Sequence, residues 1–429
     1  MAIDNKDKKV LKSSIEREQN EVACSAECEK IKGSKNLNVP PLRFPEFSGE
    51  WKAEQLDNIA TLSKGIGISK EQLSEDGEPC ILYGELYTKY KSEIIKQVES
   101  KTDINGSKLK RSKANDVIIP CSGETAVDIA TARCVPFDNI LFGGDLNVIS
   151  LHQYDGAFMS YQLNGKRKYD IARVAQGVSI VHLYGEHLKA IKTYNPTLPE
   201  QQKIAKLLSL LDDRIDTQNK IIEKLQSLIK GLSQQLLSSE NDWILYRLDD
   251  LAQIKSGYSG TQVSYQTPYK VSRIETISKH CIDIQRIGYV ECIPESYRLN
   301  VGNILFSNIN SIQYIGNTAY LDKDYGLYHG MNLLRIIPNT TIVRPRFLHL
   351  LLCTDWAINH FQTICNKAVS QASINQTALG KSRFPIPPMS VQQQICSMFE
   401  LTERKLDNEQ EYISCLQQQK RYLLQKMFI

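Results

Sequence analysis

Two sets of mostly polar residues, one in each half of the chain, include side-chain types that can form directional hydrogen bonds with the edges of nucleic-acid bases. The first set is Ser63, Lys64, Gly65, Ser122, Glu124, Thr125, Gln176 and Ser179. The second set is Lys255, Ser256, Tyr258, Ser259, Asn308, Asn310, Ser311, Gln313, Gln371 and Ser373. Directional hydrogen bonds distinguish base edges, whereas phosphate contacts mainly fix position. Each residue alone can equally be an ordinary turn or cap residue, so the sets are candidates because the same slots are polar in both halves.

No catalytic or metal-binding motif accompanies these residues. The sequence contains neither a Walker A loop nor an HExxH pair. The segment Tyr194-Asn195-Pro196-Thr197 lacks the second proline and the aromatic residue of the Asn-Pro-Pro-aromatic motif of adenine methyltransferases. The 11 cysteines are mostly scattered singly, which favours a reducing cytoplasm, and the Cys24 and Cys28 pair has no second ligand pair. We therefore expect no catalytic residue, metal or cofactor in this chain.

The two polar sets correspond because the chain repeats itself. The segment WKAEQLDNIATLSKG from Trp51 matches WILYRLDDLAQIKSG from Trp243. Further on, NDVIIPCSGETAVDIATA runs parallel to GNILFSNINSIQYIGNTA, and PEQQKIAKLLSLLDDRID from Pro199 matches SVQQQICSMFELTERKLD from Ser390. All three matches occur in the same order at shifts of about 190 residues, which makes coincidence improbable.

A long helix with heptad spacing is predicted after each half's variable segment. Core positions of the first helix are Ile204, Leu208, Leu211, Ile215, Gln218, Ile222, Leu225 and Ile229. The equivalent core positions of the second are Ile395, Phe399, Thr402, Leu406, Glu409, Ile413, Leu416 and Lys420. Capping-box patterns, Thr197-x-x-Glu200 and Ser390-x-x-Gln393, mark the two helix starts. The polar pair Gln218 and Glu409 either fixes the register of the helices or marks a frayed point or partner contact.

These signals predict an α+β protein in which two mixed α/β bodies form a tandem pseudo-twofold repeat with two long helices. The expected divisions are a disordered extension (1–39), body 1 (40–196), a central helix (197–240), body 2 (241–388) and a C-terminal helix (389–429). The helices bury their apolar stripes most simply against each other, as an antiparallel coiled coil. A helix of about 40 residues is about 60 Å long, enough to hold two bodies over half-sites at most about 17 base pairs apart.

The sequence resembles the specificity subunits of type I restriction-modification systems. The resemblance is carried by PPLRFPEFSGEW at Pro40, by LPEQQKIAKLLSLLDDRI and by its echo PMSVQQQICSMFELTERKL. It implies that the bodies are target-recognition domains reading an asymmetric two-part DNA target. It also implies two methyltransferase subunits and two translocase-nuclease subunits as partners, which would hold S-adenosylmethionine, ATP and Mg. The second helix departs from the pattern at Thr402, Glu409 and Lys420.

Two other classes of function stay open. The chain could be a stand-alone DNA-binding regulator with a symmetric site, or a nuclease or transferase using Asp145 or Glu124. The net charge of +4 is only mildly basic, so charge alone does not identify DNA as the partner. No run of about 18 apolar residues and no secretion signal is present, so we expect a soluble, cytoplasmic protein without a membrane partner.

Overall fold

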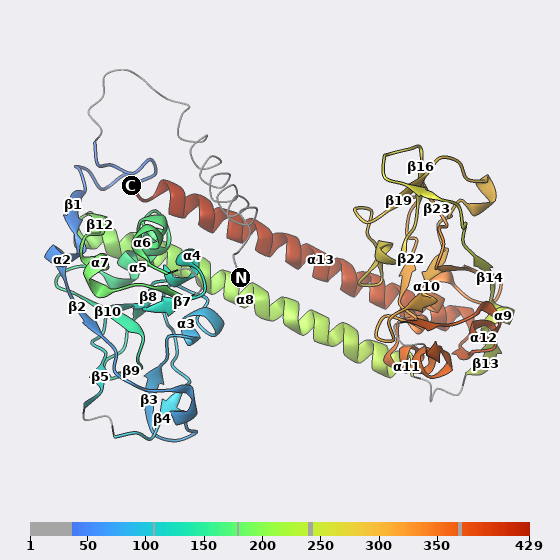
Figure 1. Ribbon diagram of the computed structural model, residues 1–429, viewed down its shortest axis with the longest axis horizontal. Helices are drawn as coiled ribbons and strands as arrows, with labels where there is room; N and C mark the ends of the chain where they lie inside the picture. Colours follow the sequence, from blue (N-terminus) through green and yellow to red (C-terminus); the bar gives the residue numbers. More distant parts are fainter. Residues whose placement is uncertain (1–36, 106–107, 178–179, 239–242, 368–370) are drawn as a thin grey trace, which may run out of the picture. The chain divides into compact units, whose positions relative to one another are not determined.

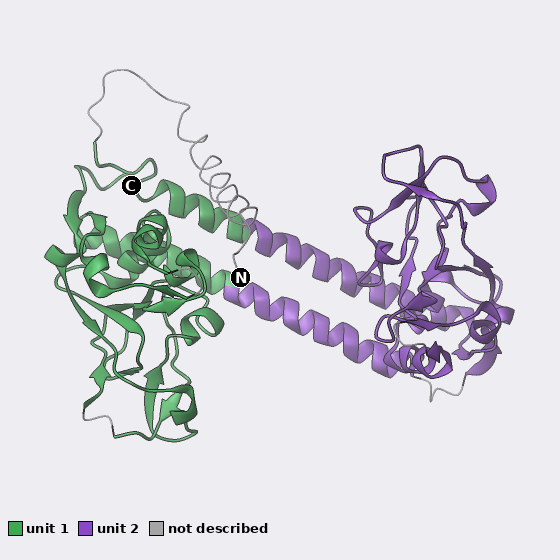
Figure 2. Ribbon diagram, in the orientation of Figure 1, with its two compact units in different colours: residues 1–215, 416–429 green, residues 216–415 purple. Residues whose placement is uncertain are grey.

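The computed structural model describes residues 37–429 apart from 106–107, 178–179, 239–242 and 368–370. It divides into two compact units, Met1–Ile215 with Leu416–Ile429 (unit 1) and Asp216–Cys415 (unit 2) (Figure 2). Each unit therefore contains one body together with a part of both long helices. The predicted extension at 1–39, the Cys24 and Cys28 pair and the candidate Ser179 fall almost wholly outside the described residues.

Body 1 is built on a four-stranded antiparallel sheet in the order β2-β10-β6-β8 (Figure 1). Its strands are β2 (Ala60–Lys64), β10 (Leu146–Leu151), β6 (Asp116–Pro120) and β8 (Arg133–Val135). A second sheet has the order β4-β3-β9-β5, comprising β4 (Lys101–Thr102), β3 (Glu78–Ile81), β9 (Leu141–Phe142) and β5 (Lys110–Arg111). Two short pairs join β1 (Lys52–Gln55) to β12 (Lys192–Asn195) and β7 (Ser122–Gly123) to β11 (Val181–His182). The helices are α2 (Leu56–Ile59), α3 (Glu85–Thr88), α4 (Ala126–Ile129), α5 (Gly156–Asn164), α6 (Lys168–Val174) and α7 (Gly185–Lys189).

Body 2 repeats the four-stranded antiparallel sheet and three strands of the second sheet, whose fourth strand lies at the opposite end. Its antiparallel sheet runs β14-β24-β20-β22, with β14 (Ala252–Ser256), β24 (Leu334–Pro338), β20 (Ile304–Phe306) and β22 (Thr318–Tyr320). The second sheet runs β15-β19-β16-β23, with β15 (Gln262–Val263), β19 (Gly288–Val290), β16 (Tyr269–Val271) and β23 (Leu327–Tyr328). The smaller strands are β13 (Ile244–Arg247) with β27 (Arg383–Ile386), β17 (Ile277–Ser278) with β18 (Cys281–Ile282), and β21 (Ile309–Asn310), β26 (Ala372–Ser373) and β25 (Asn366–Lys367). The helices are α9 (Leu248–Leu251), α10 (Pro345–Leu352), α11 (Asp355–Ile364) and α12 (Gln376–Gly380).

The sequence repeat is thus a structural repeat. In both bodies the second sheet contains one parallel pair, β3 with β9 and β16 with β23. Two glycines at equivalent positions explain a further identity, because a Cβ atom on Gly65 or Gly257 would collide with the backbone carbonyl oxygen of Gly143 or Gly330, respectively. Only glycine permits this close approach of two backbone segments.

The long helices are α8 (Leu198–Leu236) and α13 (Met389–Lys426), and they pack together within each unit. In unit 1, Ile204 and Leu208 of α8 share a core with Met427 at the end of α13. In unit 2, Ile395 and Phe399 of α13 share a core that Ile229, Leu232 and Leu236 of α8 also contact. The early part of each helix thus meets the late part of the other, which is the predicted antiparallel pairing.

The first long helix begins directly after Thr197, as predicted, but neither capping box forms as expected. The Glu200 carboxylate does not complete a capping box but accepts hydrogen bonds from Arg43 (2.7 and 2.8 Å) and from the Trp51 indole (3.3 Å). Ser390 cannot be an N-cap because α13 already begins at Met389. Glu200 is completely buried, so its carboxylate needs hydrogen-bond donors inside the protein. Arg43 and Trp51 supply them in place of the local cap.

A buried glutamine attaches each long helix to its body in the same way. Gln201 donates to the Pro196 carbonyl (2.8 Å) and accepts from the Asp155 amide (2.9 Å). Its repeat equivalent, Gln392, donates to the Pro387 carbonyl (2.9 Å) and accepts from the Arg344 amide (2.8 Å). The helix start and the preceding strand are therefore held by identical hydrogen bonds in both halves.

We expect Gln392→Leu to destabilise unit 2 by about 2 to 4 kcal/mol, because leucine leaves buried backbone groups without a partner. Urea denaturation of the variant measures this loss. The matched control is Gln393→Leu, since Gln393 is exposed and bonds only Ser397 of the same helix (2.9 Å). Equal losses for the two variants would contradict the role assigned to Gln392.

Candidate nucleic-acid interface

In body 1 the structure brings several of the predicted polar residues into one loop cluster. The β7 strand pairs Ser122 with His182, and Gln176 exchanges two backbone hydrogen bonds with His182 (2.7 and 2.9 Å). Ser122 and Gln176 are therefore neighbours although they are far apart in the sequence. Glu124 follows β7 and is exposed.

The hydroxyl of Thr125 is already used within this cluster. It caps α4 by accepting from the Asp128 amide (3.1 Å) and donates to the Asp128 carboxylate (2.6 Å). Thr125 thus has the ordinary capping role that the sequence left open. Its neighbours Ser122 and Glu124 instead line a cavity of about 710 Å³.

That cavity has an aromatic and aliphatic rim that the sequence did not single out. Tyr83 and Tyr87 are about 40% exposed, and Ile180 is 60% exposed. The Tyr87 hydroxyl donates to the Ser122 carbonyl (3.2 Å), which ties the rim to the β7 turn. Tyr83 and Tyr87 lie around the short helix α3, where no periodic pattern marks an exposed ring, so only their clustering with Ser122 identifies them.

The Ser63-Lys64-Gly65 group lies at the end of β2, beside the same turn. Lys64 is exposed, and its charge acts on the neighbouring Cys121. Burial raises the pKa of the Cys121 thiol to about 11, and the ammonium of Lys64 opposes that rise. Ser63 and Gly65 are half-buried, so Lys64 is the member of this group that is free to reach a ligand.

In body 2 the corresponding cluster is the small sheet β21-β26-β25. Ile309 pairs with Ser373 across it, and the Asn308 side chain donates to the Ile374 carbonyl (3.3 Å). Asn310 donates to the Ser307 hydroxyl (3.1 Å) and accepts from the Ser311 amide (2.8 Å). The two asparagines therefore shape the loop, whereas Gln313 and Gln371 are exposed.

The remaining candidates of body 2 divide between packing and solvent. Lys255, Ser256 and Ser259 are exposed. Tyr258 is half-buried and its ring packs edge-on against Tyr297, with centroids 5.3 Å apart. Tyr258 is thus part of an aromatic cluster rather than a free side chain.

Among the described residues, no group of three His, Cys, Asp or Glu side chains is arranged to hold a metal ion. In the same part of the chain, no helix is both long and apolar enough to cross a bilayer. Asp145, considered above as a catalytic candidate, occupies a left-handed turn (φ 59°) and its carbonyl accepts from the Cys121 amide (2.7 Å). Its backbone therefore has a structural role.

Comparison with known proteins agrees with the two-body architecture. The family model described as type I restriction modification DNA specificity domain matches twice, over residues 48–227 and 240–418. A putative specificity subunit of the type I restriction enzyme MjaX from Methanocaldococcus jannaschii is 38% identical over 193 residues, covering 44% of this chain and 45% of that protein. The MjaVIII specificity subunit of the same organism is 23% identical over 394 residues, covering 82% and 85%.

Solved structures show the same fold. The type I S subunit from M. genitalium aligns with a TM-score of 0.59 at 17% identity, covering 91% of this chain and 99% of that one. A chain from a structural study of type I complex assembly and conformational transition aligns with a TM-score of 0.56 at 15% identity, covering 90% and 99%. The chain therefore belongs to the type I restriction-modification DNA specificity family and is a specificity subunit, the non-catalytic component of such systems.

Proposed function

We propose that this chain selects a two-part DNA target, with each body reading one of two unlike half-sites. The observation that carries the proposal is the structural repeat. Both bodies have the same order in the four-stranded antiparallel sheet and the same glutamine attachment to a long helix, whereas the polar residues in equivalent loop slots differ. Two readers on the same scaffold with different side chains suit a target whose halves have different sequences.

The half-site contacts of body 1 are assigned to the exposed side chains around the β7 turn. Glu124 can accept a hydrogen bond from a cytosine amino group, and Gln176 can pair with adenine, while Lys64 suits a phosphate or a guanine. In body 2 the equivalent assignment falls on Lys255 and Ser256 and on Gln313 and Gln371. Ser179 stays a candidate although it lies outside the described residues.

The helices are proposed to be both the spacer and the docking surface for methyltransferase subunits. Two pairs of repeat-equivalent residues expose apolar side chains on them, Leu210 (51%) with Leu401 (66%), and Ile221 (37%) with Tyr412 (37%). We call these four residues the docking stripe. Exposed apolar side chains in line on a helix are typical of partner-binding faces. Because two of these residues lie at repeat-equivalent positions on each helix, the docking stripe supports two copies of the same partner.

The chemistry would belong to those partners. Two methyltransferase subunits would hold S-adenosylmethionine, and two translocase-nuclease subunits would hold ATP and Mg. The role of this chain is then to choose where they act, in the cytoplasm where the DNA lies.

Methylome sequencing of the host with the gene intact or deleted tests the proposal. We expect adenine methylation at one asymmetric split sequence with an unread gap, and its complete loss on deletion. A symmetric continuous target would favour the regulator hypothesis instead. Methylation or cleavage by the purified chain without partner subunits would overturn the non-catalytic assignment.

A further inference from the structure

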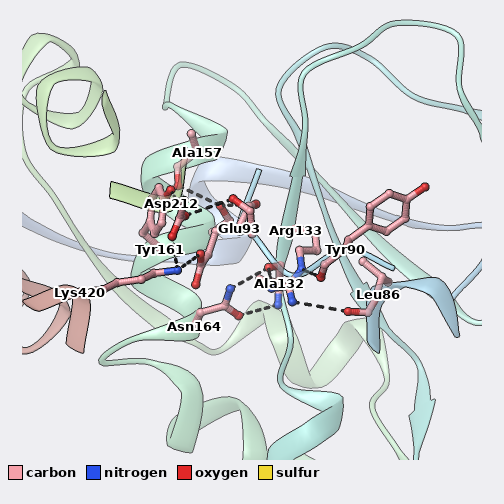
Figure 3. Close-up of polar contacts among 12 residues, drawn as sticks. Leu86, Tyr90, Glu93, Ala132, Arg133, Ala157, Tyr161, Asn164, Asp212 and Lys420 are labelled. Carbon is pink, nitrogen blue, oxygen red and sulfur yellow. Dashed lines mark hydrogen bonds and ion pairs between the residues drawn. The ribbon is translucent and has the colours of Figure 1, made fainter. Parts of the chain in front are cut away.

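The sequence singled out Lys420 as an unexplained charge at a core position of the C-terminal helix, where the repeat equivalent is Ile229. The structure explains it, since the Lys420 side chain enters body 1 (Figure 3). Its ammonium lies 2.6 Å from the Glu93 carboxylate and 2.6 Å from the Asp212 carboxylate. The side chains of Lys420, Glu93 and Asp212 are only 16%, 9% and 5% exposed. This is a buried ion triad, made by three separate parts of the fold.

Neighbouring groups complete the hydrogen bonding of the triad. The hydroxyls of Tyr161 and Ser92 donate to the second oxygen of Asp212, at 2.6 and 3.1 Å. Buried Arg133 donates to the Tyr90 carbonyl (2.9 Å) and its charge acts on Glu93. Lys420 and Arg133 thus both offset the charge of Glu93, in a place where an unpaired charge would be costly.

The pKa values agree with a charged lysine. Burial by itself would lower the pKa of Lys420, but Glu93 and Asp212 outweigh it and raise the pKa. Burial raises the pKa of Glu93, and the charge of Lys420 opposes that rise. Losing the lysine would leave two buried carboxylates without the ion-pair partner that they share.

Each member of the triad comes from an element that must be placed correctly relative to the others. Glu93 lies between α3 and β4 of body 1, Asp212 lies on α8 and Lys420 lies on α13. An apolar stripe tolerates small sliding, whereas a buried ion pair is satisfied in one geometry only. Sliding α13 by one helical turn, about 5.4 Å, would remove Lys420 from both carboxylates.

We propose that Lys420, Glu93 and Asp212 form a positioning lock that sets the orientation of body 1 on the helix pair, and thereby the single gap length allowed between the half-sites. This inference rests on the proposed two-part target. One extra base pair shifts a half-site by about 3.4 Å and rotates it by about 34°. A body held at one angle rejects that displacement, whereas a body that can tilt accepts it.

The second repeat has a weaker version of this contact. Glu403, the repeat equivalent of Asp212, pairs with Arg346 of α10, and these side chains are 37% and 19% exposed. Ile229 stands at the position of Lys420, and its aliphatic side chain cannot supply the central cation of such a triad. The lock is therefore a feature of body 1. Its loss should change the gap length that is allowed, without changing the sequence that either body recognises.

The test compares methylation by the complex of this chain with its co-purifying methyltransferase subunit. The DNA set carries both half-sites with the native gap or a gap one base pair shorter or longer. We expect the wild type to prefer the native gap by at least about tenfold, and Lys420→Met to reduce this preference to about threefold or less. Lys420→Arg keeps the charge and should restore most of the preference.

A second variant separates positioning from stability. Glu93→Met with Lys420→Met removes both charges and keeps the volume, so thermal stability should recover relative to Lys420→Met. The relaxed gap preference should persist in this double variant. The matched control is Lys220→Met, which breaks only the exposed pair between Lys220 and Asp216 on α8 and should leave the preference intact.

A native gap preference in both the single and the double variant would overturn the lock. Recovery of stability together with the gap preference in the double variant would also overturn it, because the charges would then be dispensable for positioning. Failure of the proposed function looks different, since the wild-type complex itself would then show no two-part target.

Discussion

Exchanging residues 51–196 for the first body of another specificity subunit should completely change the sequence recognised at one half-site (its word) and leave the word of the other half-site unchanged. Body 1 has its own apolar cores around Ile119 and Phe142, and the main core of unit 2 contains no residue of body 1. Each body therefore has what it needs to fold around its own core. Methylation at the old first word should fall by about 100-fold or more, since each mismatched base pair costs about 1 to 3 kcal/mol.

Contacts to the helices decide whether such an exchange folds. Trp51 and Phe158 of body 1 pack with Phe428 beyond α13, at ring distances of 5.3 to 6.4 Å. The donor body must supply equivalent aromatic residues and a carboxylate at the Glu93 position. The reciprocal exchange of 241–388 is the control, and it should change only the second word. A change of both words after either exchange would contradict modular reading.

The double substitution Leu210→Asp and Leu401→Asp should prevent assembly with the methyltransferase while the free chain stays folded. Both leucines are at least half exposed in the chain alone, so the substitutions cost little stability in the free protein. In an assembled complex each aspartate would be a buried, unpaired charge. We expect the dissociation constant for the methyltransferase to rise at least about 100-fold, which corresponds to about 2.7 kcal/mol.

Analytical ultracentrifugation of mixtures with the methyltransferase subunit measures this effect. Leu210→Asp alone is compared with the control Ser227→Asp, which adds the same single charge on a different exposed face of α8. Unchanged assembly of the Leu210→Asp and Leu401→Asp double variant would show that the docking stripe is not the docking surface. Equal loss in the Ser227→Asp control would point to charge rather than to the stripe.

Features written into short stretches of sequence were predictable. The internal repeat corresponds to the same order of the four-stranded antiparallel sheet in both bodies, and heptad spacing predicted two long helices close to the observed Leu198–Leu236 and Met389–Lys426. Their pairing followed because two apolar stripes in one chain must be buried. The polar seam residue Gln218 indeed donates to Glu409, so of the two hypotheses for this pair the structure favours a contact that fixes the register.

Features that depend on partners distant in the chain were not predictable. Tyr258 packs against Tyr297 in an aromatic cluster, although tyrosine is also a residue type that can bind DNA. The rim tyrosines Tyr83 and Tyr87 became candidates only because folding places them beside Ser122. A polar side chain has the same local signature whether it will be exposed, capping or buried.

By itself, the sequence determined the repeat, the helices and their pairing, because periodic burial is encoded within a few turns of chain. Only the tertiary structure decided which polar side chains meet, and Lys420 is the clearest case. Its partner Glu93 is 327 residues away in the sequence. In the sequence, a charge at a core position looks like an interruption of the heptad pattern. Whether it is stabilised depends on the opposite charges that the fold places around it, and these do not have to be neighbours in the chain.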